Sequence, residues 1–150
     1  MKPDDIDLQL QHGTHGWDYA RLSVNRTVHE FTLTGIFNDP LEGLAESAVR
    51  LDAGDATATF TWYEEPGRFD FTFTRIPTAQ HLDRVTIVDS DRVNVAPIEF
   101  TVKRAFWLKL VRAELSKIML LATDEHYAKN RTVKELPWDA IQALCGKISP

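Results

Sequence analysis

The sequence predicts an α+β fold with a mainly antiparallel sheet of about six strands, one short helix after the first hairpin, and two C-terminal helices packed on one face. Two patterns support this class. β-Prone runs with alternating apolar residues follow one another between Trp17 and Val102, whereas helical spacing occurs only after Asp39 and after Lys103. With 150 residues, 43% of them hydrophobic, the chain is long enough for one core, so we expect a single domain spanning 1–150.

The N-terminal third is expected to begin with a loosely ordered lead-in over residues 1–15, which is acidic and contains glycine. Two β-prone runs follow, 17–24 and 27–37, and the Asn25-Arg26 pair between them predicts a hairpin turn. In the second run His29, Phe31 and Leu33 share one face, which we expect to be buried.

The first helix is predicted by its start signals. Asp39 can cap it, Pro40 suits the first helical position, and Glu42 stands at capping-box spacing. Leu41, Leu44, Ala45, Ala48 and Val49 then recur at helical spacing until Gly54.

The strongest hairpin signal lies in the middle of the chain. Residues 56–63 alternate Ala, Phe and Trp with Thr and Tyr, and Phe69, Phe71 and Phe73 alternate after the turn. Pro66 and Gly67 fit the two central positions of a type II turn. Two further strands are predicted over 82–88 and 93–102, with Pro97 suggesting an edge or a bulge.

The C-terminal third is predicted to be helical over 105–128 and again over 137–148. In the last helix Cys145 shares an apolar row with Trp138, Ile141 and Ile148, which predicts a buried, unreactive thiol.

Charge is distributed unevenly along the chain. Residues 1–100 carry a net charge of −9 and residues 101–150 carry +4. The acidic part would repel nucleic acid and attract a basic partner, so nucleic-acid binding is disfavoured. The basic residues of the long helix are expected to face solvent or to pair with the acidic sheet. The single cysteine, the acidic N-terminus and the absence of a long apolar run predict a cytoplasmic protein that is not inserted in a membrane.

His12 and His15 are the residues most suggestive of a metal site, although a zinc site needs more ligands and the spacing selects no third one. We expect no metal and no cofactor. The sequence also lacks the common nucleophile, phosphate-loop and dinucleotide motifs, so no catalytic residue is predicted and an enzyme is less expected than a binding protein.

Trp62, Glu64, Glu65 and Asp70 form the predicted partner-binding surface, because acidic and aromatic residues gather around the central turn. Two other interpretations remain for the acids, a solvated turn and an acid/base pair, and Trp62 is either an exposed anchor or a core residue. The rival class is a small enzyme or ligand-binding protein with a cleft between sheet and helices.

Two strings, Phe37-Asn38-Asp39-Pro40-Leu41 and Phe60-Thr61-Trp62-Tyr63-Glu64-Glu65-Pro66-Gly67, resemble a pattern in small bacterial α+β domains of uncharacterised function. Some such domains are immunity proteins of polymorphic or contact-dependent toxin systems. The resemblance implies a cytoplasmic binding protein that blocks a toxin, without cofactor or catalysis. Since many such toxins are basic nucleases, the resemblance agrees with the acidic N-terminal two-thirds.

Overall fold

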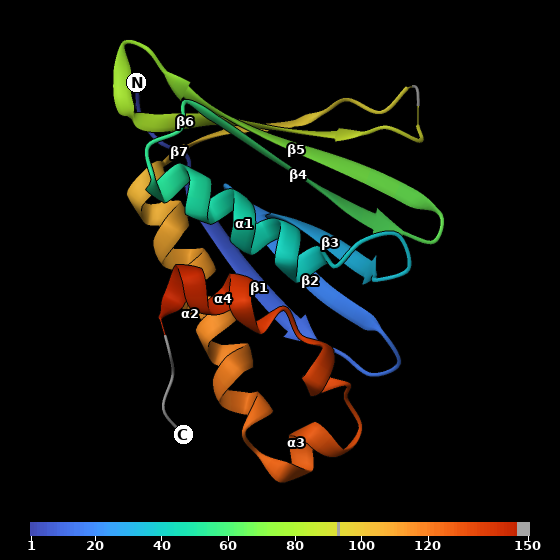
Figure 1. Cartoon of the computed structure of the whole chain (residues 1–150). Coiled ribbons are helices and arrows are strands. Elements are labelled where there is room, and N and C mark those ends of the chain that lie inside the picture. Colours follow the sequence, from blue (N-terminus) through green and yellow to red (C-terminus); the bar gives the residue numbers. More distant parts are fainter. Residues whose placement is uncertain (93, 147–150) are drawn as a thin grey trace.

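The computed structural model describes residues 1–92 and 94–146, and it divides the strands between two antiparallel sheets (Figure 1). The first sheet has the order β1-β2-β3: β1 Ile6–His12, β2 Trp17–Val24, β3 Thr27–Thr34. The second has the order β4-β5-β6-β7: β4 Thr57–Glu64, β5 Gly67–Ile76, β6 Ala79–Asp89, β7 Ile98–Lys103.

Helices α1, α2 and α4 lie together on one side of the strands (Figure 1). The helical elements are α1 Pro40–Asp52, α2 Arg104–Ala122, α3 Glu125–Lys129, the single 3₁₀ turn η1 Val133–Glu135, and α4 Trp138–Cys145. In the part of the chain that the structure covers, no helix combines the length and the apolar composition that crossing a membrane requires.

The predicted α+β class with antiparallel strands is confirmed, but the single sheet of about six strands is wrong. The additional strand is β1, in the segment that was predicted to be a loose lead-in. Ile6, Leu8 and Leu10 alternate with polar residues and are buried, and β1 pairs with β2 along its whole length. The free edge of β1 is covered by α2, where Glu114 accepts the backbone N–H of Leu10 at 2.8 Å.

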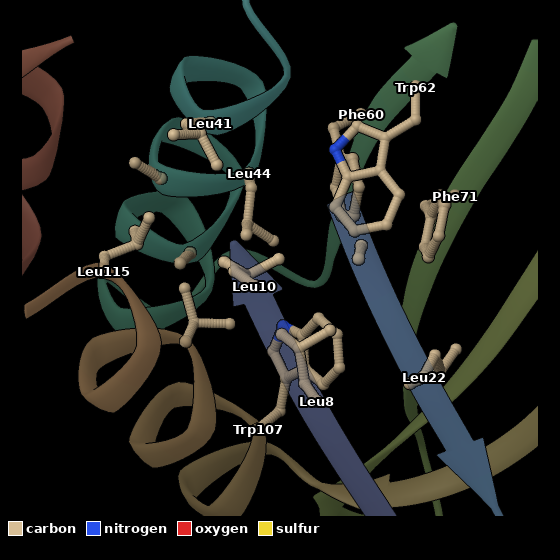
Figure 2. Close-up of a cluster of buried hydrophobic side chains, with 14 of the residues drawn as sticks. Leu8, Leu10, Leu22, Leu41, Leu44, Phe60, Trp62, Phe71, Trp107 and Leu115 are labelled. Carbon is tan, nitrogen blue, oxygen red and sulfur yellow. The ribbon is translucent and has the colours of Figure 1, made fainter. Parts of the chain in front are cut away.

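The two sheets and the helices share one hydrophobic core (Figure 2). Phe31 of β3 packs on Trp62, Phe69 and Phe71 of the second sheet, with ring centroids 5.4, 5.0 and 6.0 Å apart. Figure 2 shows Leu41 and Leu44 of α1 approaching this aromatic group from the helical side. The split between the sheets is therefore filled by side chains.

Side chains also bridge the sheets where no strand pairing joins them. At one end Glu64 accepts the backbone N–H of Thr32 at 2.7 Å. At the other end Asp4 accepts the N–H of Thr101 in β7 at 2.7 Å, and its own N–H donates to the Thr101 carbonyl. These contacts satisfy edge groups that periodicity alone does not reveal.

Several predicted boundaries need correction. The central turn is formed by Glu65 and Pro66, joined by a cis peptide, because Gly67 already pairs with Glu64; the type II turn on Pro66-Gly67 is wrong. Of the strand predicted over 93–102, the part after Pro97 is confirmed, as β7. The predicted helix over 105–128 divides after Ala122, because Asp124 caps the separate helix α3 by accepting the N–H of Tyr127. Val93 and Ile148 lie outside the described residues.

A buried ion pair connects three elements. The Arg104 guanidinium donates twice to Asp83 of β6, both at 2.8 Å, and its third nitrogen donates to the carbonyls of Leu51 and Asp55. Arg112 of α2 also pairs with Asp52, at 2.9 Å. The expectation that basic residues of the long helix pair with the acidic sheet is confirmed for Arg104, whereas Arg112 pairs with a helix residue, Asp52 of α1.

Candidate functional site

A buried histidine–aspartate pair marks one end of the first sheet. His12, the last residue of β1, lies opposite Asp18 in the strand register, and His12 Nδ1 lies 2.6 Å from Asp18 Oδ1. Both residues continue the inward-facing rows of their strands, after Leu10 and before Ala20. Strand alternation therefore turns two polar side chains toward the interior, and His12 is only 7% exposed.

The second nitrogen of His12 has no hydrogen-bond partner among the described residues. Nε2 is buried, although a buried polar atom normally has a partner. Because Nδ1 faces a carboxylate, which only accepts, Nδ1 carries the proton and Nε2 is the accepting atom in the neutral ring. The backbone of His12 is held separately: the Arg131 guanidinium donates to the His12 carbonyl at 2.9 Å and stacks over the ring of Tyr127.

Asp39 contributes a second partly desolvated carboxyl group. Its Oδ1 caps α1 by accepting the N–H groups of Leu41 and Glu42, as predicted from the sequence. Burial raises the pKa of Asp39, with a further contribution from the negative charge of Asp18, while the two backbone hydrogen bonds act in the opposite direction.

These groups line a pocket of about 350 Å³ between the β2 and β3 ends, the start of α1 and η1. We call it the acidic pocket, because its wall holds four carboxylates and, among the described residues, neither lysine nor arginine. The carboxylates are Asp18, Asp39, Glu65 and Glu135. The apolar part of the wall comes from Trp17, Ile36, Pro40, Leu41 and Leu136.

Large apolar side chains border the acidic pocket. Ile36 is 72% exposed and Phe37 is 65% exposed, and Ile36 also belongs to the pocket wall. The Phe37 ring lies 5.0 Å from that of Tyr63. We call Ile36, Phe37 and Tyr63 the apolar rim.

The loop that carries Ile36 and Phe37 is fixed at both sides. The N–H of Ile36 donates to the Thr34 hydroxyl at 3.2 Å, and the Asn38 amide donates to the Thr61 carbonyl at 2.9 Å. The exposure of Ile36 and Phe37 is therefore a property of an anchored loop.

The four residues predicted as a partner surface do not form one surface. Trp62 is a core residue, 0% exposed, and donates its indole N–H to the Pro40 carbonyl, so its role as an exposed anchor is wrong. Glu64 bridges the sheets through Thr32. Glu65 lines the acidic pocket and accepts the Thr34 hydroxyl at 3.3 Å.

Asp70 lies on the opposite face of the β4-β5 hairpin, where it accepts hydrogen bonds from Thr61, Arg68 and Ser90. Partial burial tends to raise its pKa, but the bonds from Ser90, Thr61 and Arg68 together hold the pKa of Asp70 below its ordinary value. Strand alternation separates it from Trp62 and Glu64, since it pairs with Thr61.

The two predicted metal candidates have different environments. His12 is buried against Asp18, whereas His15 is exposed in the β1-β2 turn, with φ at 59°. Nowhere in residues 1–92 and 94–146 do three His, Cys, Asp or Glu side chains converge in a way that could hold a metal ion. Cys145 on α4 is half-buried where full burial was expected, and this burial raises the pKa of its thiol.

A larger groove of about 760 Å³ runs between the outer face of the first sheet and α2-α3. Its charged side chains already have partners. Arg21 pairs with Glu30 at 2.7 Å, and Lys117 pairs with Glu114 at 2.8 Å. His12 lines both spaces, so its unsatisfied nitrogen does not distinguish them. Of the two, the acidic pocket is the one with excess negative charge, and it is therefore the stronger candidate.

Sequence reasoning missed the convergence of His12, Asp18 and Asp39. The available signal was a polar residue in phase with apolar ones: His12 follows Ile6, Leu8 and Leu10, and Asp18 precedes Ala20 and Leu22. Comparison with protein-family models, curated proteins and solved structures finds no match to this chain.

Proposed function

We propose that this chain is a non-enzymatic protein-binding domain that docks a basic partner on the acidic pocket and the apolar rim. The observation that carries the proposal is that Ile36 and Phe37, both strongly exposed in an anchored loop, adjoin a pocket walled by four carboxylates. Exposed aromatic and aliphatic side chains beside complementary charge are typical of partner-binding surfaces.

The net charge of −9 over residues 1–100 supports the choice of a basic partner, because a negative field attracts such a partner. The form of binding that we favour is that of a cytoplasmic, toxin-neutralising immunity protein, as the sequence resemblance implies. Of the residues predicted to bind the partner, the proposal retains Glu65. It replaces Trp62 and Asp70 by the acidic pocket and the apolar rim.

The proposal is tested by selecting a displayed library of random peptides on the full chain. We expect the selected peptides to be rich in arginine or lysine, and to bind the double variant Ile36→Ser/Phe37→Ser at least about tenfold more weakly. Val28→Ser is the matched control, because Val28 is also exposed but lies at the other end of β3. Selection of acidic peptides, or equal binding to the parent and the double variant, would contradict the proposal.

A small enzyme or ligand-binding protein is the second candidate, favoured by the buried His12–Asp18 pair in the pocket wall. A carboxylate that orients a histidine can support general-base chemistry. This candidate predicts that small neutral molecules bind in the pocket of the full chain, with binding lost in Asp18→Asn and unaffected by Phe37→Ser, since Phe37 is not part of the pocket wall. A fragment screen by NMR separates the two candidates.

A further inference from the structure

We propose that the acidic pocket is an arginine site, in which a guanidinium group donates to His12 Nε2 and to the carboxylates of Asp39 and Glu65. This inference rests on the proposed function, since the arginine would belong to the basic partner. It names the chemical group that the partner inserts.

Three side chains of the wall offer hydrogen-bond acceptors to a cation that has several donors. His12 Nε2 is a buried acceptor without a partner. Asp39 accepts both bonds from α1 through Oδ1, which leaves its other oxygen, and the Glu65 carboxylate lies at the β4-β5 turn. These acceptors come from three separate elements. A planar guanidinium presents five N–H donors in a fixed fork and can reach acceptors on different sides, whereas an ammonium acts as a point charge.

The charge and shape of the pocket agree with this ligand. Burial raises the pKa of Asp39, and an adjacent guanidinium would offset that cost by stabilising the ionised carboxylate. The apolar wall of Ile36, Pro40 and Leu136 suits the methylene stem of arginine. A metal ion fits less well, because no three ligands converge in the described residues.

The test uses the full chain and N-acetyl-arginine methylamide, an arginine side chain without charged termini. NMR should show saturable shifts of the His12 ring and the Asp39 carboxyl. The neutral citrulline analogue, which has nearly the same shape, should bind at least about tenfold more weakly, as should the lysine analogue. Before addition, the His12 ¹⁵N shifts should show an unprotonated Nε2.

Two further variants test the arginine site without changing the buried His12–Asp18 pair. Glu65→Gln should weaken the arginine analogue at least about threefold, whereas Glu99→Gln, which removes an exposed acid on β7, should leave binding unchanged. Circular dichroism would check that both variants fold. A protonated Nε2 in the free protein, equal binding of the citrulline or lysine analogue, or shifts that map elsewhere would overturn the arginine site.

The two proposals fail in different ways. Arginine-analogue binding together with selected peptides that ignore Ile36 and Phe37 would remove the proposed docking surface and keep the arginine site. Peptides that require Ile36 and Phe37 but are enriched in lysine and not in arginine would keep the proposed docking surface and remove the arginine site.

Discussion

Asp39 has two effects on stability that oppose each other. Its Oδ1 caps α1, which stabilises the helix, while burial raises its pKa and makes the ionised form less favourable in the folded chain. Because the folded pKa exceeds the unfolded one, this penalty is present at neutral pH and disappears as the pH falls below both values. A carboxylate that lowers stability where an amide would cap equally well is typical of a functional site.

Asp39→Asn and Asp39→Ala separate these effects. Asparagine keeps the cap and removes the charge, so we expect its free energy of unfolding to be above that of the parent at pH 7 and equal to it at about pH 3. Alanine removes the cap and should be less stable than asparagine by about 1 kcal/mol. Urea unfolding at both pH values measures this, and an asparagine variant no more stable than alanine would refute the capping role.

At the scale of elements, the sequence predicted what local periodicity controls. Strands at 17–24 and 57–64 and the helix from Pro40 agree closely with expectation, because alternation, capping and Gly54 are local signals. The division into two sheets was not predictable, because local alternation does not specify which strands pair. The contacts of Glu64 and Asp4 with distant strands, which join the two sheets, are equally invisible to a local pattern. β1 was overlooked although its alternation was present, because the surrounding acids and glycines suggested a loose segment.

The candidate site was less predictable than the fold. Glu65 was expected at the partner surface and lines the acidic pocket, and His12 was singled out as a metal ligand but pairs with Asp18. The pocket brings together residues from β1 to η1, and strand patterns do not specify which distant segments meet. Trp62 illustrates the converse, since its phase with Phe60 already indicated burial.

The contact between Asp4 and β7 gives a prediction for the junction of the sheets. Hydrogen bonds from Asn25 and from the Thr101 N–H lower the pKa of Asp4. A lowered folded pKa gives stability that is present above the unfolded value and is lost as the pH falls through the folded one. Asp4→Ala should therefore lower the free energy of unfolding by about 1–2 kcal/mol at pH 7, and the difference from the parent should shrink toward about pH 3.

Asp5→Ala is the control for this junction, because Asp5 is exposed and contacts Asn25 through its backbone. Denaturant unfolding across this pH range measures both variants. Equal losses from Asp4→Ala and Asp5→Ala, or a loss for Asp4→Ala that does not depend on pH, would show that the carboxylate does not join the sheets.

At the scale of the whole molecule, one core and one buried ion pair hold the sheets and helices together. Arg104 begins α2, contacts Asp83 of β6 with two hydrogen bonds, and binds carbonyls at the end of α1. This side chain therefore fixes α1, α2 and β6 relative to one another. Removing one partner leaves a buried charge without compensation, which is far more costly than losing an exposed pair.

We therefore expect Asp83→Ala to lower the free energy of unfolding by about 3–5 kcal/mol. Asp52→Ala is the matched control: it breaks the more exposed pair with Arg112, also on α2, and should cost less than about 1 kcal/mol. The double variant Asp83→Leu/Arg104→Met removes both charges, so its loss should be well below the sum of the losses caused by Asp83→Leu alone and by Arg104→Met alone. Tryptophan fluorescence and far-ultraviolet circular dichroism should report one coincident denaturant transition for each folded variant, since Trp62 and Trp107 lie in the same core. Similar losses from Asp83→Ala and Asp52→Ala, or additive losses in the double variant, would show that the buried pair does not couple β6 to the helices.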